Sequence, residues 1–161
     1  MARKVPTDED RREAQRILVV GLATGVDVFE LSVAVAELHP KNNTFPGEVF
    51  MGVGADTLEI TGFDDGEPLR YEGLLGTYLG ECEFKGREHR KIQFAILCCA
   101  ALRGGLEPDL LDEIVWWQTD DFWRYGLLAA VALVRASADR HGMSVPELAR
   151  RLADRYGIEL G

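Results

Sequence analysis

The chain has 161 residues, of which 47% are hydrophobic and 28% are charged; this is typical of a globular protein with one domain rather than two. Its formal net charge of −9 argues against broad binding to nucleic acids or anionic membranes, because both depend on positive charge meeting phosphate. The three cysteines cannot all pair with one another, and the adjacent Cys98 and Cys99 lie in an apolar run, which indicates packed thiols in a reducing compartment rather than a disulfide framework.

Neither a targeting signal nor a membrane span is evident. The N-terminal sequence MARKVPTDEDRREAQ lacks the apolar stretch that a secretory signal needs. The longest apolar runs, FAILCCAAL and LLAAVALV, are well short of the roughly 18 residues expected of a spanning helix. We therefore expect a cytoplasmic protein that does not enter the membrane.

Two helices are predicted in the first forty residues. Thr7 is a suitable N-cap for a helix whose first turn is DED and which continues to Gly21. The sequence ILVVGLATG at its end could suggest a strand before a phosphate-binding loop, but both common glycine-rich nucleotide motifs are absent. Asp27 and Glu30 form a capping-box pattern for a second helix, which should end before Pro40.

Residues 39–72 have a different composition, rich in Gly, Pro, Asn and Asp, with the β-friendly pieces EVFMGV and TLEITGF. The sequence DDG is a reasonable hairpin turn. We therefore predict a non-helical insertion here, either a small β-hairpin or a long Gly/Pro-rich loop. Part of a calcium-loop pattern is present, but Thr61 and Phe63 occupy positions that require stronger oxygen ligands, so no calcium site is expected.

Helical patterns resume in PLRYEGLLGTYLGE, GREHRKIQFAILCCAALRGG, EPDLLDEIVWW and DDFWRYGLLAAVALVRASADRHG. A last helix should begin at a capping box formed by Ser144 and Glu147 and end at Gly157. The sequence thus predicts a mainly α protein, a single-domain bundle of about six helices over residues 1–161. We expect the helices near Lys91–Arg103 and Phe122–Ala138 to form its centre, because both are apolar over most of their surface.

The most unusual stretch is IVWWQTDDFWRYG, residues 114–126. Thr119 can cap the following helix, and this places Asp120 and Asp121 in its first turn, where each carboxylate stabilises the dipole by roughly 0.3–1 kcal/mol. Successive residues on a helix point about 100° apart, so these aspartates do not by themselves form a catalytic pair. Tryptophan is rarely fully buried and is enriched at interfaces. The candidate binding residues here are Trp116, Trp117, Asp120, Asp121, Trp123 and Arg124, with core packing of the rings as the alternative.

GREHRK is the one basic cluster of this acidic chain. Positive charge is unfavourable at the start of a helix, so Arg87, Arg90 and Lys91 either pair with acidic groups of the chain or bind an anion or an acidic partner. Arg87, His89 and Arg90 are the candidate binding residues of this cluster. The chain has no C-x-x-C, no histidine pair at metal-binding spacing and no G-x-S-x-G. We therefore assign no metal, no cofactor and no catalytic residue.

These patterns favour a protein-interaction or binding module that associates with itself, as a homo-oligomer, or with another protein, through helix faces or the Trp-rich corner. The main alternative is a small-molecule-binding protein or enzyme with a pocket between the WWQTDDFWR corner and the GREHRK turn. A weaker alternative is a DNA-binding regulator, because RASADRHGMSVPELARRLADRYG resembles a helix-turn-helix. It would use Arg150, Arg151 and Arg155, against the charge of the chain.

Overall fold

The computed structural model describes residues 8–38, 47–61, 87–105, 107, 110 and 122–160. Within these ranges the chain forms helices and no strand, which confirms the predicted mainly α bundle. The helices are α1 (Asp8–Thr24), α2 (Val28–Leu38), α3 (Gly47–Ile60), α5 (Arg87–Arg103), α7 (Phe122–Arg140) and α8 (Val145–Tyr156). None of the described helices is both long enough and apolar enough to span a membrane.

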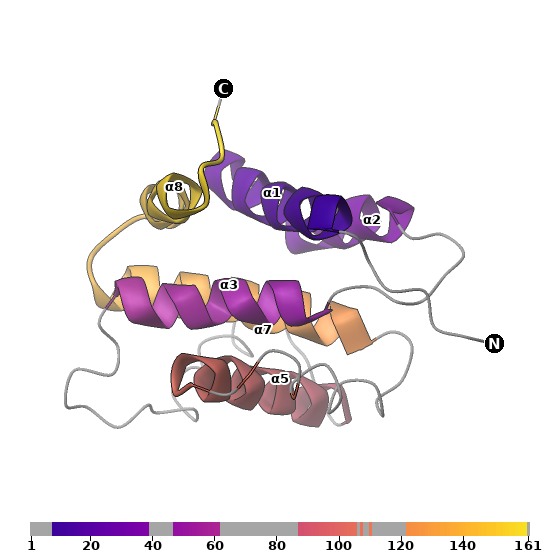
Figure 1. The fold of residues 1–161 in the computed structure, drawn as a ribbon. Coiled ribbons are helices and arrows are strands. Elements are labelled where there is room, and N and C mark those ends of the chain that lie inside the picture. The colour runs from indigo at the N-terminus through magenta and orange to yellow at the C-terminus, as the bar shows by residue number, and fades with distance from the viewer. Residues whose placement is uncertain are drawn as a thin grey trace.

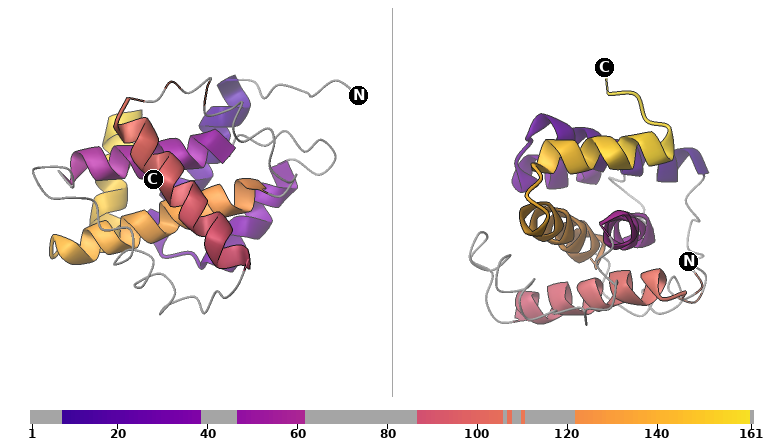
Figure 2. Two further views of the ribbon diagram at one scale, coloured as in Figure 1. Left: turned by 90° about the horizontal axis from the view of Figure 1, so that it is seen from below. Right: turned by 90° about the vertical axis from the view of Figure 1, so that its left-hand side faces the viewer.

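The helices are arranged in three layers (Figures 1 and 2). Helices α3 and α7 lie side by side in the middle layer, with α5 running across one of their faces. Helices α1, α2 and α8 cover the opposite face, where α1 packs mainly on α8. A hydrophobic cluster fills the space on each side of the middle layer, and both clusters include residues of α3 and α7.

Helix α7 is the centre of the protein, as its apolar sequence predicts. Every residue from Tyr125 to Ala138 except Arg135 is buried. Leu128, Ala132 and Leu133 face α5, whereas Leu127, Val131 and Val134 belong to the cluster beneath α1 and α8. A helix with neighbours on two opposite sides must be apolar nearly all round, which explains the small polar fraction of this segment.

Among the described helices, the second predicted central helix, α5, lies in an outer layer instead. Ile92, Ile96 and Cys99 are buried against α3 and α7, but Leu97 on the other side is 43% exposed. The place beside α7 belongs to α3. Apolar composition alone therefore overestimated the burial of α5.

Residues 47–60 are helical, so the prediction of a non-helical insertion over 39–72 is wrong for this stretch; residues 39–46 and 62–72 lie outside the described ranges. Phe50 and Val53 face one cluster, and Met51 and Leu58 face the other. These spacings of three and seven residues are helical, but burial on both sides also gives the β-friendly composition that suggested strands. Tertiary packing overrides the intrinsic preference of valine and phenylalanine here.

The end signals of α8 are read correctly from the sequence, whereas α1 continues to Thr24, three residues past the expected Gly21. The Ser144 hydroxyl accepts a hydrogen bond from the Glu147 backbone N–H at 3.2 Å, and α8 begins at Val145, directly after this cap. Gly157 ends α8 with a φ of 68°, and the Ile158 N–H donates to the Ala153 carbonyl at 2.8 Å. This left-handed glycine satisfies the last carbonyls of the helix.

Candidate functional site

The residues predicted to form the Trp-rich corner are only partly described. Trp116, Trp117, Asp120 and Asp121 lie outside the described ranges. Trp123 is half-buried and packs against the cluster shared by α1, α2, α3, α7 and α8, whereas its neighbour Arg124 is exposed.

The basic cluster at the start of α5 is described through its backbone alone. Arg87, His89 and Arg90 all lie in the first turn of this helix, as predicted. The structure describes the backbone of these residues but not their side chains, so the expected pocket between this turn and the Trp-rich corner stays a prediction.

An apolar surface on α2 is the first feature that the structure adds. Phe29 is 72% exposed and Val33 is 44% exposed, and Ala36 is exposed as well. These three residues are spaced four and three positions apart, so they share one face of the helix. We call Phe29, Val33 and Ala36 the α2 face. Leu31 and Val35 point the other way and are buried.

The α2 face has an acidic border. Asp27, Glu30 and Glu37 are all exposed around it. The Asp27 carboxylate also accepts a hydrogen bond from the Phe29 backbone N–H at 3.3 Å, which fixes the start of α2. Neither the helix nor the turn before it, residues 25–38, contains a lysine, arginine or histidine. The surface is thus apolar in the middle and negative at the rim.

A cleft between α1 and α3 is the second feature. It has a volume of about 310 Å³. Its lining residues come from one face of each helix: Asp8, Arg11, Arg12 and Gln15 from α1, and Val49, Gly52 and Asp56 from α3. Spacings of three, four and seven residues bring each set together. The lining carries two arginines and two aspartates.

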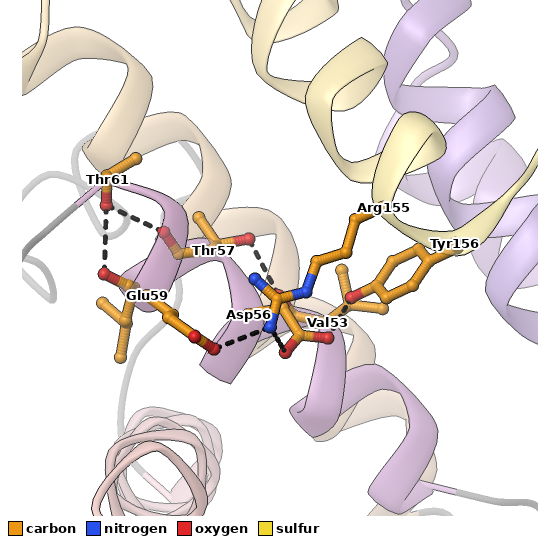
Figure 3. A network of polar contacts seen from close by, with 8 residues as sticks. Val53, Asp56, Thr57, Glu59, Thr61, Arg155 and Tyr156 are labelled. Carbon is orange, nitrogen blue, oxygen red and sulfur yellow. Dashed lines mark hydrogen bonds and ion pairs between the residues drawn. The ribbon is translucent and has the colours of Figure 1, made fainter.

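Asp56 at one side of this cleft is held by the end of α8 (Figure 3). The Tyr156 hydroxyl donates a hydrogen bond to Asp56 Oδ2, and the Arg155 Nη2 lies 3.5 Å from Asp56 Oδ1. The same Nη2 donates to Glu59 Oε2 at 2.7 Å. Burial, together with the adjacent carboxylate of Asp56, raises the pKa of Tyr156 well above its usual value. The phenol therefore stays protonated and keeps donating to Asp56 over the whole neutral range.

Two threonine hydroxyls in this region form hydrogen bonds to the backbone of α3. The buried Thr57 hydroxyl donates to the Val53 carbonyl at 2.8 Å, and Thr61 donates to the Thr57 carbonyl at 2.8 Å. Such bonds from a residue to the preceding turn satisfy a hydroxyl within its own helix. Neither threonine is arranged as a nucleophile.

The two described cysteines are buried thiols, as predicted. Cys98 and Cys99 are both free. Burial raises the pKa of Cys98 to about 11. The pKa of Cys99 is raised further, mainly by burial and to a lesser extent by the neighbouring Cys98. The thiolate is the reactive and metal-binding form of cysteine, so both side chains act as small apolar groups at neutral pH.

The outer face of α8 bears on the DNA-binding alternative. Arg150 and Arg151 are exposed, but Glu147 and Asp154 are exposed on the same helix. Arg155 is bound to Glu59. Charges of both signs alternate here, which differs from the continuous positive surface that phosphate contacts require.

No family model, curated protein or solved structure matches the chain. Any role of the α2 face or of the cleft is therefore inferred from the geometry of this chain alone.

Sequence reasoning did not single out either feature. For Phe29 and Val33 a general signal exists, because apolar residues on all sides of a short helix indicate that some must meet solvent or a partner. For Asp56 and Tyr156 no local signal exists, because the two residues are 100 positions apart.

Proposed function

We propose that this protein is a self-associating interaction module, and that two copies meet through the α2 face. The observation that supports it is the exposure of Phe29 at 72% beside Val33 at 44%. Burying one such side chain completely is worth about 1.5–3 kcal/mol. A fold that keeps both on the surface gives up this stabilisation in the monomer and recovers it on association.

The order of side chains along the α2 face fits a symmetric pair. Most homodimers have two-fold symmetry, so each residue meets the same patch of the other copy. When two α2 helices lie antiparallel with their Val33 residues close together, the large Phe29 of each copy comes within one residue, about 1.5 Å along the axis, of the small Ala36 of the other. Large residues against small ones let two helices interlock closely.

The experiment compares Phe29→Glu with Leu97→Glu by sedimentation equilibrium over a range of protein concentrations. Both substitutions place a carboxylate on an exposed apolar site, but Leu97 lies on α5, in the layer on the other side of the α3–α7 pair. We expect a concentration-dependent dimer for the wild type and for Leu97→Glu, and a monomer for Phe29→Glu. Circular dichroism checks that both variants keep their helices.

Three results would contradict the proposal. A wild-type protein that stays monomeric at the highest concentration rules out self-association. A dimer that survives Phe29→Glu shows that another surface, such as the Trp-rich corner, makes the contact. Equal loss of the dimer in both variants shows that added negative charge, rather than the α2 face, is responsible.

A further inference from the structure

The interior of helix α3 contains two glycines, Gly52 and Gly54, and packing explains only the second of them. A glycine within a helix costs roughly 0.5–1 kcal/mol relative to alanine. At Gly54 a Cβ atom would lie 2.7 Å from Cys99 Sγ and 3.0 Å from Leu133 Cδ1, so the close approach of α5 and α7 requires glycine. At Gly52 a Cβ atom would meet nothing within 4 Å. Its lack of a side chain leaves open the cleft that it lines.

The charged residues that line the cleft are balanced in number, and one of them, Asp56, is also paired with Arg155 of α8. Arg11 and Arg12 supply two guanidinium groups, and Asp8 and Asp56 supply two carboxylates. An anion would be attracted by the arginines but repelled by the carboxylates, and a simple cation would meet the reverse. A small molecule that carries both charges meets a complementary group for each.

We propose that this cleft binds a small zwitterion of the α-amino acid type with an uncharged side chain. Arginine suits a carboxylate because its planar fork donates two parallel hydrogen bonds, which assigns the carboxylate to the exposed Arg12, with Arg11 beside it. The ammonium group is assigned to Asp56. Val49 and the open space over Gly52 receive the side chain. The volume of about 310 Å³ is at the small end of ligand pockets, which run from roughly 300 to 1,000 Å³.

The carboxylate of Asp56 is held in place by contacts within the chain, before any ammonium group binds. Tyr156 and Arg155 approach its two carboxylate oxygens from α8 and fix their direction. A carboxylate has about four lone-pair positions, so it can accept further bonds from an ammonium group. A group already held in place loses little entropy on binding, and this raises affinity.

Three probes of similar shape test the class of ligand. Their binding is measured from the shifts of the backbone amide signals of α1 and α3 in nuclear magnetic resonance spectra. Leucine carries both charges, isoamylamine lacks the carboxylate, and 4-methylpentanoate lacks the ammonium group. We expect saturable shifts with leucine and at least about tenfold weaker binding of each single-charge probe, equivalent to roughly 1.4 kcal/mol. The proposal is overturned if leucine leaves these amides unshifted or if either single-charge probe binds equally well.

Two variants locate the site. Gly52→Gln fills the cleft without a clash at its Cβ, and Arg12→Gln removes one of the carboxylate ligands. The matched control is Arg16→Gln, which removes an exposed arginine of α1 that pairs with Glu13 and does not line the cleft. Both site variants should weaken leucine binding at least about tenfold, and the control should leave it unchanged. Binding that persists in Gly52→Gln, or falls equally in Arg16→Gln, excludes the cleft as the site.

Discussion

At the residue scale, the contrast between Gly52 and Gly54 gives a direct test of the packing. Gly54→Ala should destabilise the protein by about 1–3 kcal/mol, because the added methyl group forces Cys99 and Leu133 to move within a packed core. Gly52→Ala should instead stabilise it by about 0.5–1 kcal/mol, since the methyl group meets open space and the unfolded chain loses freedom. Urea unfolding followed by circular dichroism measures both. Equal effects of the two substitutions would show that α3 does not pack against α5 as described.

The surroundings of some single residues could be predicted from the sequence, and those of others could not. It predicted that Cys98 and Cys99 are packed thiols, because an apolar run around cysteine is a local signal, and both are buried. It could not predict that Gly54 lies against Cys99, because contacts between helices depend on how the whole chain folds. The same holds for Asp56 and Tyr156. Trp116, Trp117, Asp120 and Asp121 lie outside the described residues, so their role stays a prediction.

At the scale of the elements, the contact between α8 and α3 should make stability depend on pH in the alkaline range. An unfolded tyrosine ionises near pH 10, whereas the folded pKa of Tyr156 lies well above this value because of burial and the bond to Asp56. Below pH 10 the phenol is protonated in both states, and its stabilisation is fully present. Above pH 10 the unfolded chain releases this proton and the folded chain keeps it, so stability falls by up to about 1.4 kcal/mol per pH unit.

The variant Tyr156→Phe isolates this contribution. At pH 8 it should be less stable than the wild type by about 1–2 kcal/mol, because the half-buried Asp56 loses a hydrogen-bond donor. Between pH 10 and 11 the difference should shrink, since the variant has no phenol to ionise. Urea unfolding of both proteins at a series of pH values gives the difference directly. If it stays constant as the pH rises, neither burial nor the bond to Asp56 raises the pKa of Tyr156 in the folded state.

The success of sequence analysis for each element follows from where its signals come from. The ends of α8 were predicted correctly because Ser144 and Gly157 act on neighbouring backbone groups, which the sequence itself places nearby. Helix α3 was mistaken for part of an insertion because its two buried faces give it a composition that also suits strands. Helix α5 was expected at the centre because its composition is apolar, but it has the α3–α7 pair on one side only. Burial on one side or two depends on neighbours that periodicity does not identify.

At the scale of the whole molecule, the three layers around α7 bury most apolar side chains of the described helices, and Phe29, Val33 and Leu97 are exceptions. The mainly α bundle was predictable because helical periodicity is repeated along most of the chain. Which helix face stays exposed was not, because that depends on the way the layers close over one another. The proposed dimer follows from this exposed face, and the net charge of the molecule then determines how the dimer should respond to salt.

Self-association through the α2 face should become stronger as salt is added. Each copy carries a net charge of −9, and the exposed Asp27, Glu30 and Glu37 border the contact, so like charges approach one another when the dimer forms. Salt screens this repulsion, with a Debye length that falls from about 10 Å at 0.1 M to about 3 Å at 1 M. Sedimentation equilibrium in increasing sodium chloride should therefore give a falling dissociation constant.

The double variant Glu30→Gln/Glu37→Gln identifies the source of this repulsion. Because it removes two negative charges from the rim of each copy and leaves Phe29 and Val33 in place, it should form a tighter dimer with a flatter response to salt. A dissociation constant that rises with salt in the wild type would mean that attraction between opposite charges holds the two copies together. That result would move the contact from the α2 face to a surface that brings arginines of one copy against acidic residues of the other.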